Sequence, residues 1–404
     1  MFARRRTPLL TIAAATAVLI VACGSSEQPI VSDPSNPIQP SETSEAELEQ
    51  QFAAGLGSVW DTDFSKHSAS LAEFTSGGPP KDGIRALDEP KFESIAEGDE
   101  VVVDREPVIA LELNGDARAY PLGILTRHEI ANDVVGGVPV AVTFCPLCNS
   151  AIVYERELDG VVYDFGVSGF LRNSDLVMFD RQTDSWWQQF TGEALVGVLT
   201  GALLEVVPSS TVSWEDFKAT YPEGRVLSRD TGFGFDYGFN PYVNYDSVET
   251  PFLFRGEFDD RLSPIERVVA VELNGEAVAY PFSLLEEQRV VHDTVGGESI
   301  VVFLQPGTAS ALAGQKIAEA RDVGASGVFV PEASGRSLTF RAGGDGFVDE
   351  ETGSLWNVLG KAVEGTLSGE ELEPIVHGDH FWFAWAAFNP ETRVFGEAQP
   401  TTTT

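Results

Sequence analysis

Basic residues are scarce in this chain of 404 residues. Only 26 lysines and arginines stand against 62 aspartates and glutamates, which gives a formal net charge of −36 at pH 7. A field of this sign repels phosphate groups, so nucleic acids and anionic lipid headgroups are poor partners. Two hydrolase signatures are missing as well. The sequence has no Gly-x-Ser-x-Gly elbow, and His128-Glu129 lacks the second histidine of a His-Glu-x-x-His helix.

A long hydrophobic run is also missing from the N-terminal region. Three arginines at positions 4–6 precede an apolar stretch over residues 9–22, which is the layout of a signal peptide and is too short for a convincing membrane span. Aliphatic and small residues directly before Cys23 resemble a bacterial lipobox. We therefore expect residues 1–22 to be a lipoprotein signal peptide and Cys23 to carry a lipid. An ordinary cleaved signal with an incidental cysteine is the alternative.

Composition divides the rest of the chain into a tether, a body and a tail. Residues 23–60 are rich in Ser, Pro, Glu and Gln, a composition typical of a disordered tether, and residues 399–404 are expected to be a disordered tail. The body has a first repeat with an N-terminal extension (61–230), an aromatic and glycine-rich connector (231–264) and a second repeat (265–398). The connector could stack a flat ligand, but aromatic rings more often pin such a segment onto the body.

The body carries one module twice. Residues 106–151 align with residues 266–311 without a gap, and 20 of the 46 aligned positions are identical. Each copy has an Asn-Gly pair between two strand-like runs, which is the strongest short signal for a β-hairpin. Helical patterns are few, at 121–131 and 213–221, and they do not alternate regularly with the strands. The sequence therefore predicts a β-rich α+β protein whose internally duplicated module has approximate two-fold pseudo-symmetry.

Only the first copy has a Cys-x-x-Cys sequence. Cys145 and Cys148 align with Gln305 and Thr308, so both thiols are lost from the second copy while the proline between them is kept. A disulfide would close so small a loop that it stabilises the fold by only about 2 kcal/mol. Alternatively, the pair could react as a redox dithiol, or could hold one edge of a tetrahedral metal ion that needs two more ligands. The motif alone leaves these three interpretations open.

His128 is the residue expected to act with the thiols. It lies on the predicted helix that leads, through a turn, into the strand ending at Cys145, and the second copy has no histidine at the aligned position. A neutral imidazole could be a third ligand for a metal such as zinc or copper, while a protonated one would favour the thiolate. We therefore expect the ring of His128 to point toward Cys145 and Cys148.

Four more polar residues are candidates for binding a cofactor or ligand. Glu129, Asn132 and Asp133 follow His128, and Asn132 would share its helix face because the two are four residues apart. A cluster of capping and hydrogen-bonding groups is the alternative, and it fits Asp133 best because an aspartate recurs in the second copy. Arg181 is the fourth candidate, since an acid replaces it there. The residues around Arg181 recur, so turn formation and packing explain them better.

Five strings of residues stand out across the body: Gly77-Gly78-Pro79-Pro80-Lys81-Asp82-Gly83-Ile84, His128-Glu129-Ile130-Ala131-Asn132-Asp133, Thr143-Phe144-Cys145-Pro146-Leu147-Cys148, Asp180-Arg181-Gln182-Thr183 and Phe381-Trp382-Phe383-Ala384-Trp385. Together they resemble the uncharacterised bacterial and archaeal family known as Domain of Unknown Function 3179. The resemblance covers residues 64–395. It implies an extracytoplasmic location and no established activity or cofactor.

These observations predict an extracytoplasmic lipoprotein that is anchored to the membrane through Cys23. Its single site, around Cys145, Cys148 and His128, would handle a metal or carry out thiol redox chemistry. The alternative is a non-catalytic ligand-binding or scaffold lipoprotein with a structural disulfide and a cleft between the copies. The sequence leaves the substrate, the metal, the partner and the activity open.

Overall fold

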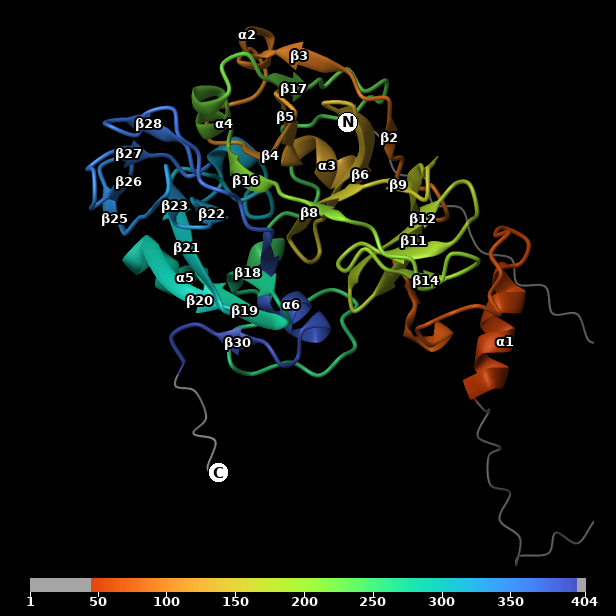
Figure 1. Cartoon of the computed structure of the whole chain (residues 1–404). Coiled ribbons are helices and arrows are strands. Elements are labelled where there is room, and N and C mark those ends of the chain that lie inside the picture. Colours follow the sequence, from red (N-terminus) through yellow and green to blue (C-terminus); the bar gives the residue numbers. More distant parts are fainter. Residues whose placement is uncertain (1–44, 398–404) are drawn as a thin grey trace, which may run out of the picture. The chain divides into compact units, whose positions relative to one another are not determined.

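Short β-strands joined by tight turns make up most of the computed structural model, which describes residues 45–397 (Figure 1). The predicted β-rich fold with few helices is confirmed. The signal peptide expected over residues 1–22, Cys23 and the tail expected over residues 399–404 lie outside the described residues. None of the described helices is long and apolar enough to cross a membrane.

The strands up to residue 227 form three five-stranded sheets and one two-stranded hairpin. In spatial order they are β1 (Thr75–Ser76), β11 (Phe165–Arg172), β12 (Asp175–Asp180), β13 (Trp186–Gln188) and β14 (Ala194–Val196); β15 (Val206–Val207), β8 (Ser150–Glu155), β7 (Val138–Cys145), β6 (Ile130–Val135) and β2 (Leu87–Asp88); β16 (Ser210–Ser213), β4 (Pro107–Leu113), β5 (Asp116–Pro121), β17 (Arg225–Leu227) and β3 (Phe92–Ser94); and β10 (Val161–Val162) with β9 (Glu157–Leu158).

The strands after residue 264 form sheets of four, three, two and four strands. In spatial order they are β29 (His377–Phe381), β18 (Arg267–Leu273), β19 (Glu276–Pro281) and β30 (Arg393–Val394); β20 (Val290–Val295), β21 (Glu298–Gln305) and β22 (Ala325–Phe329); β23 (Glu332–Ala333) with β24 (Arg336–Ser337); and β25 (Phe340–Gly343), β26 (Gly346–Asp349), β27 (Leu355–Trp356) and β28 (Ala362–Glu364).

The helices of the described chain are short, with α1 the longest. They are α1 (Glu45–Leu56), α2 (Ile95–Gly98), α3 (Leu122–His128), α4 (Trp214–Thr220), α5 (Phe282–Gln288) and α6 (Trp382–Phe388), with 3-10 turns η1 (Leu71–Glu73), η2 (Tyr245–Ser247) and η3 (Ile317–Glu319). The predicted helix at 213–221 is confirmed as α4. The side chain of Ser213 caps it by accepting a hydrogen bond from the amide of Asp216.

The hairpins predicted from the Asn-Gly pairs are present in both copies. Asn114 and Gly115 have φ values of 53° and 82°, and the second turn, at Asn274 and Gly275, has values of 49° and 80°. Two consecutive positive φ values are what a two-residue turn of the favoured type requires, and asparagine and glycine adopt them at low cost. Local sequence therefore fixes β4–β5 and β18–β19.

The two copies keep the same strand pairing as far as the cysteine motif and then diverge. Val108 pairs with Pro121 in the first copy, and Val268 pairs with Pro281 in the second. After the second hairpin of each copy the connections differ. Residues 146–149 join β7 to β8, whereas residues 306–324 separate β21 from β22. The tight turn that holds the cysteines is therefore specific to the first copy. The approximate two-fold axis between the copies stays a prediction.

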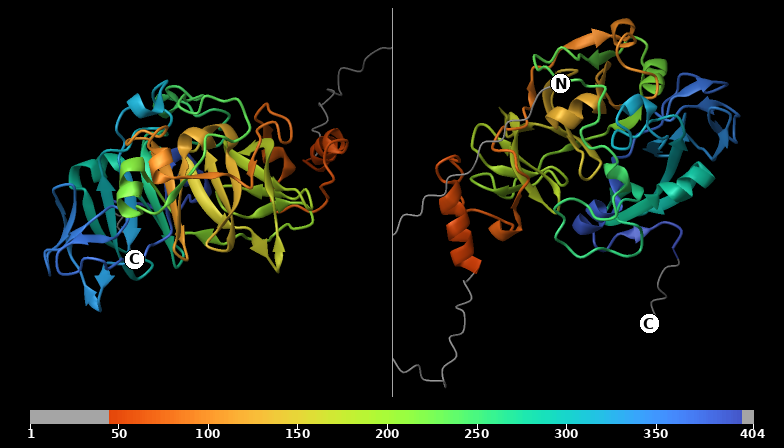
Figure 2. Two further views of the ribbon diagram at one scale, coloured as in Figure 1. Left: turned by 90° about the horizontal axis from the view of Figure 1, so that it is seen from above. Right: turned by 180° about the vertical axis from the view of Figure 1, so that it is seen from behind.

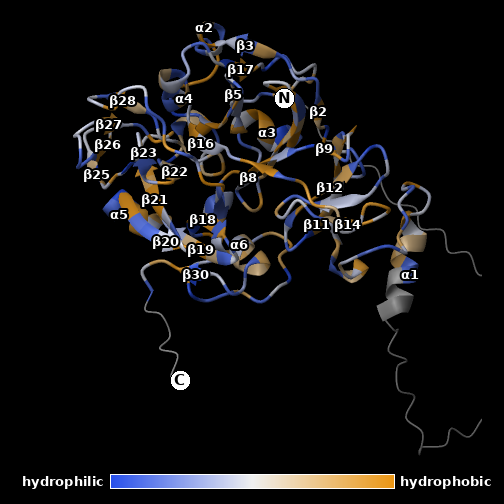
Figure 3. Ribbon diagram, in the orientation of Figure 1, coloured by the Kyte–Doolittle hydropathy of each residue, from blue (hydrophilic) through white to orange (hydrophobic). Residues whose placement is uncertain are grey.

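Side chains from both copies share hydrophobic cores. One core joins Ile109, Val142 and Phe144 to Phe381 and Trp382, and α3 and β8 contribute hydrophobic stretches (Figure 3). The strands also meet directly: the amide of Phe381 donates to the carbonyl oxygen of Cys148 at 2.9 Å. Figure 2 shows the yellow strands of the first copy beside the teal and blue strands of the second. Within the described residues, the two repeats thus pack into one compact unit.

Part of the segment predicted to be a disordered tether is helical. Helix α1 lies within residues 23–60, and Phe52 contacts Phe170 and Trp186 with ring centroids 5.7 and 6.3 Å apart. Compositional averaging concealed this anchor, because Phe52, Ala53 and Leu56, which pack against the core from one side of the helix, lie in a mostly polar stretch. The residues before position 45 lie outside the described structure.

The aromatic connector packs its tyrosines onto both copies. Tyr237 and Tyr245 are buried, while Phe233 and Phe235 are largely exposed. The hydroxyl of Tyr237 contacts the ring of His128, and the ring of Tyr245 lies 6.2 Å from that of Phe381. Pinning by aromatic rings is therefore how this segment is held.

Candidate functional site

The cysteine motif forms a tight turn at the end of β7, a strand whose last six residues are buried. Near the end of β7 the residues on both faces of the strand are buried, so Cys145 lies in the core. The amide of Cys148 closes the turn by donating to the carbonyl oxygen of Cys145 at 3.3 Å, and Asn149 then adopts a φ of 51°. The thiols are accordingly held on one side of a short, rigid connection, and their exposed fractions are 2% and 0%.

Asp175 completes a group that was not anticipated from the sequence. It begins β12, directly after a turn in which Asn173 and Ser174 both have positive φ values. Its Oδ2 accepts hydrogen bonds from the side-chain amide of Gln188 at 2.6 Å and from the backbone amide of Phe190 at 3.0 Å. Its Oδ1 is buried and, within residues 45–397, has no hydrogen-bond partner. A buried carboxylate oxygen without a partner is costly.

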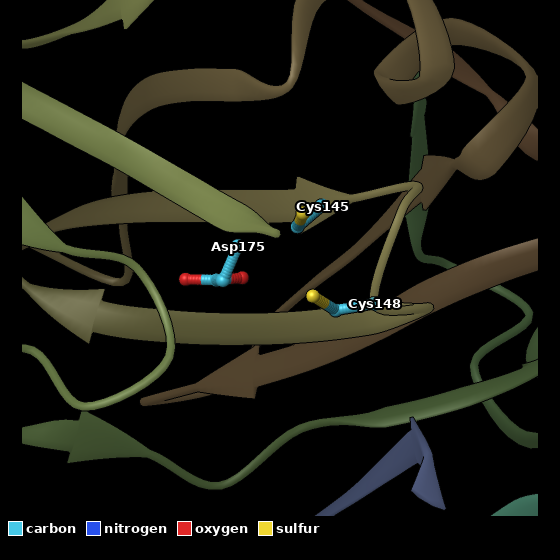
Figure 4. Close-up of side chains that lie close together, drawn as sticks. All are labelled: Cys145, Cys148 and Asp175. Atoms are coloured by element: carbon cyan, nitrogen blue, oxygen red, sulfur yellow. The ribbon is translucent and has the colours of Figure 1, made fainter. Parts of the chain in front are cut away.

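The sulfur atoms of Cys145 and Cys148 and a carboxylate oxygen of Asp175 all lie within 4.8 Å of one another. Figure 4 shows the three side chains directed into the same space from β7, the turn and β12. The cysteines come within 3.9 Å of each other, and both are free. A structural disulfide, one of the three interpretations of the motif, is therefore not observed.

Burial controls the protonation of this group. It raises the pKa of the Cys145 thiol and raises that of Cys148 well above its ordinary value. Burial also raises the pKa of Asp175 to about 7, although the side-chain amide of Gln188 and the two thiols offset part of the effect. The thiol of Cys148 donates to the carbonyl oxygen of Ser174 at 3.6 Å. Both shifts favour the protonated thiols, which are weaker nucleophiles than thiolates.

The structure does not bring His128 into this group. Its Nδ1 lies 2.6 Å from the carbonyl oxygen of Arg85, and its Nε2 lies 2.7 Å from the hydroxyl oxygen of Tyr237. Both ring nitrogens are thus engaged by other partners, and Asp175 takes the place expected for a third ligand. The aromatic connector, whose contacts the sequence did not predict, holds the ring in this position. A redox or metal-binding role for His128 stays a prediction without this geometric support.

The prediction that His128 and Asn132 share a helix face is wrong. Helix α3 ends at His128 because Glu129 adopts a left-handed conformation with φ of 59°, and Asn132 then lies on β6. The side-chain amide of Asn132 donates to the carbonyl oxygen of Phe165 at 2.8 Å, and its oxygen accepts from the amide of the same residue at 2.9 Å. Asn132 therefore ties β6 to β11, the strand whose hairpin carries Asp175.

Asp133 is a member of a buried hydrogen-bonding cluster. Its Oδ2 accepts from Arg118 and from the hydroxyl of Tyr120, both at 2.6 Å. In the second copy the hydroxyl of Tyr280 makes the same contact with Asp293 at 2.8 Å. Since the pattern recurs where both thiols are absent, the structural interpretation of Asp133 is supported.

Arg181 lies in a surface ion-pair network, which it forms with Asp82 and Asp88 at 3.2 and 2.9 Å. Next to it, Asp180 accepts from the backbone and hydroxyl of Thr183 and from the indole of Trp187 at 2.6, 2.9 and 3.0 Å. The aligned residues of the second copy repeat these bonds at 2.6, 2.9 and 2.9 Å. Turn formation and packing thus account for this cluster.

Glu129 is the predicted residue that is buried and interacts electrostatically with Asp175. Burial raises its pKa to about 8, and the negative charge of Asp175 adds to the rise. It lines an apolar cavity of about 350 Å³, together with Leu147 from the cysteine turn and Leu176 from β12. The cavity therefore lies against the residues that adjoin both thiols and the carboxylate.

Comparison of the two copies could have indicated Asp175 as a candidate site residue. The offset of 169 that relates Asp180 to Asp349 places Gly344 opposite Asp175, so this acid is lost from the second copy together with the two thiols. Thirty residues separate Asp175 from Cys145 along the chain, and only the packing of β12 against β7 joins them. An acid that is present only in the first copy, like the two thiols, was therefore a candidate partner for them.

The chain belongs to the family described as protein of unknown function (DUF3179), whose model matches residues 81–392. The matched segment includes Cys145, Cys148 and Asp175, and it confirms the resemblance based on short strings. No curated protein and no solved structure matches the chain.

Proposed function

We propose that Cys145, Cys148 and Asp175 bind a thiophilic metal ion and that handling this ion is the function of the protein. The observation that carries the proposal is that two sulfurs and a carboxylate oxygen of Asp175 lie within 4.8 Å of one another in a fully buried space, where Oδ1 of Asp175 has no hydrogen-bond partner in the described chain. A cation would satisfy this oxygen and the two sulfurs at once. Paired thiols of exported proteins are commonly oxidised to disulfides, and a bound metal would keep this pair reduced.

The spacing of the ligand atoms suits a tetrahedral ion. With metal–sulfur bonds of about 2.3 Å, two sulfurs bound to one ion lie roughly 3.8 Å apart, whereas a disulfide needs about 2.05 Å. The cysteines come within 3.9 Å of each other, and the carboxylate oxygen lies within 4.8 Å of both sulfurs. Three protein ligands leave one position of a tetrahedral ion open, which is the arrangement of sites that exchange or react rather than of closed structural sites.

Charge favours a divalent ion such as zinc over copper(I). Binding displaces the protons of Cys145 and Cys148, and that of Asp175 where it is present, so that two thiolates and one carboxylate face the ion. A divalent cation leaves one net negative charge in this buried space, and a monovalent one leaves two. The buried negative charge costs less in the first case. Thiolate ligands accept either metal, so geometry and charge decide between them.

A thiol redox function is the second candidate, and the pKa of Asp175, which burial raises to about 7, favours it. A carboxylate with this pKa could take a thiol proton at neutral pH. Cys145 and Cys148 would pass two electrons and two protons to a disulfide of an exported protein, becoming a disulfide while the partner becomes a dithiol. The near-complete burial of both sulfurs opposes access by such a partner, so we place this function second.

The proposed location rests on the sequence. We propose that a lipid on Cys23 anchors the protein to the extracytoplasmic face of the membrane, with the two copies related by an approximate two-fold axis. A scaffold or binding function without metal is what remains if the thiol group proves inert.

The test combines elemental analysis with thiol titration in a chain that carries Cys23→Ser. Because the chain has three cysteines, this background leaves only Cys145 and Cys148 to react. We expect about one metal ion per chain and two protected thiols, which become titratable after chelation. Cys148→Ala and Asp175→Asn should each lower the metal content at least 10-fold.

Thr308→Ala is the matched control, because Thr308 aligns with Cys148 and is equally buried in the second copy. It should leave the metal content unchanged. A metal-free protein with no titratable thiol would instead establish a disulfide, and two reactive thiols without metal would favour the redox function. Either result overturns the metal proposal.

A further inference from the structure

An apolar cavity of about 350 Å³ opens beside the thiol group, and nothing in the proposed metal site uses it. Its volume lies within the usual range for sites that bind small molecules, about 300–1,000 Å³. Its walls are almost entirely apolar, with Val167, Phe170 and Leu176 among them. Glu129 is the one ionisable carboxyl group in the lining. A small number of polar groups in an apolar cavity is the arrangement that orients a mainly apolar ligand.

The cavity is built into the strand pairing rather than left by loose packing. Strand β11 changes its register with β12 between Val167 and Leu171, and residues of this bulge form one wall. The segment after β1 crosses over the bulge, where the amide of Gly77 donates to the carbonyl oxygen of Gly169 at 2.8 Å. A Cβ at Gly169 would lie 2.0 Å from the carbonyl oxygen of Pro79, so this close crossing depends on glycine. Bulges that redirect a strand in this way are common beside functional sites.

The aromatic connector supplies the opposite wall. Tyr242, Tyr245 and Phe252 line the cavity. The hydroxyl of Tyr245 accepts a hydrogen bond from the amide of Phe252 at 3.1 Å, which fixes the two rings relative to each other. The connector thus does more than join the copies, because its rings close a space that the first copy alone would leave open.

The backbone at Glu129 is shared by both copies, but its carboxyl group is not. Glu129 and Arg289 both end a helix in the left-handed conformation, with φ of 59° and 63°. The side chain of Arg289 donates from Nε to the carbonyl oxygen of Leu304 at 2.8 Å. The carboxyl group of Glu129 instead lies in the wall of the apolar cavity. The buried acid is therefore particular to the copy that holds the thiols, and helix termination does not require it.

The chemistry of the buried acid limits the ligand. Burial raises the pKa of Glu129 to about 8, the charge of Asp175 on β12 adds to the rise, and a hydrogen bond with Tyr242 from the connector offsets part of it. Cys145 on β7 also interacts with this acid, and none of these three groups is a cation. The carboxyl group is accordingly protonated at neutral pH and can donate a hydrogen bond. An anionic ligand would meet Asp175 and the negative field of the whole chain.

We propose that this cavity binds a neutral, apolar molecule with a carbonyl oxygen that accepts a hydrogen bond from the carboxyl group of Glu129. Aldehydes, ketones and esters of medium chain length belong to this class. The cavity adjoins the cysteine turn through Leu147 and β12 through Leu176, so a bound molecule lies next to the proposed metal site. The inference does not depend on the metal, because the cavity and its acid are complete without it.

The test is calorimetric titration of the full chain carrying Cys23→Ser with 2-decanone. The Cys23→Ser change ensures that no acyl chain of the protein itself competes for the cavity. We expect one molecule of 2-decanone per chain, and decanoate should bind at least 10-fold more weakly because of its charge. Glu129→Leu keeps the approximate size but removes the donor, so the affinity for 2-decanone should fall roughly 2- to 10-fold.

Two further variants separate the hydrogen bond from the shape of the cavity. Glu129→Gln keeps an N–H donor and should retain most of the affinity, while Ile84→Trp places a large ring in the lining and should abolish binding. Arg289→Leu, at the equivalent position of the second copy, is the matched control and should change nothing. Circular dichroism confirms that each variant is folded.

Lack of measurable binding to the parent chain overturns the inference. So does equal affinity of the parent chain and a folded Glu129→Leu variant, or an unchanged affinity when Ile84→Trp is folded. Metal content is measured on the same samples. Loss of metal in Cys148→Ala with 2-decanone binding retained would show that the two sites are separate, whereas failure of ketone binding with metal retained would remove only the present inference.

Discussion

Two buried acids should make the metal-free protein less stable as the pH rises. The pKa of Asp175 is raised from 3.8 to about 7, and that of Glu129 from 4.5 to about 8, in both cases mainly by burial. The folded state therefore binds these protons more tightly than the unfolded state does. For Asp175 the cost of ionisation is absent below its unfolded pKa, grows as the pH rises toward 7, and is complete above that value.

The magnitude follows from the size of the shift. Each pKa unit corresponds to 1.36 kcal/mol, so the shift of Asp175 amounts to roughly 4 kcal/mol between pH 4 and pH 7. Between pH 5.5 and 6.5 the two acids together should lower the free energy of unfolding by about 2.7 kcal/mol per pH unit, half from each.

The assay is urea unfolding of chelated protein at several pH values between 5 and 8. Asp175→Asn should reduce the slope of stability against pH by about 1.4 kcal/mol per unit, since asparagine can still accept the bonds from Gln188 and Phe190 but binds no proton. Glu129→Gln should do the same, and the double variant should lose both contributions. A slope in Asp175→Asn equal to that of the parent chain would refute the assignment of a bound proton to Asp175 near pH 6.

Three further predictions concern the anchor and the fold. Cys23→Ser should leave the protein without acyl chains and outside the membrane fraction; a variant that stays in the membrane, with no lipid on the parent chain by mass spectrometry, would contradict the anchor. Gly169→Ala should destabilise the fold by roughly 2–4 kcal/mol in urea unfolding, because its Cβ would lie 2.0 Å from the carbonyl oxygen of Pro79. Gly137→Ala is its control: with a similar φ of 88° and open space it should cost only about 1 kcal/mol, and equal losses would show that the close approach is unimportant. Ser213→Ala should cost about 1 kcal/mol by the same assay through loss of the helix cap, and an unchanged stability would mean that the cap is dispensable.

The proposed site and the cavity would explain why the two copies differ where they do. The first copy keeps a tight turn with Cys145 and Cys148, a buried acid at Glu129 and a second acid at Asp175. The second copy keeps the hairpins and the buried turn cluster around Asp349 but none of these groups. Two segments that align in sequence, of which only the first carries these groups, are consistent with both proposals.

The sequence by itself determined those features whose cause is local. Two positive φ values at Asn114 and Gly115 set a hairpin, the side chain of Ser213 caps α4, and the cysteine motif brings its own two thiols together because only two residues separate them. The gap-free alignment of the copies also predicted the pairing register that β4–β5 and β18–β19 share. In each case the decisive interactions lie within a few residues or within one repeated segment.

Only the tertiary structure decided which residue joins the thiols. Asn132 bonds to both backbone groups of Phe165, and Gln189 donates to the hydroxyl of Thr143, so that β12 and its acid are held against β7. These bonds connect residues that are 33 and 46 positions apart, and no local pattern encodes them. For His128 the sequence predicted a position beside the cysteines that the structure does not show. Helix α3 ends at the left-handed Glu129, and the ring of His128 contacts Arg85 and Tyr237 instead.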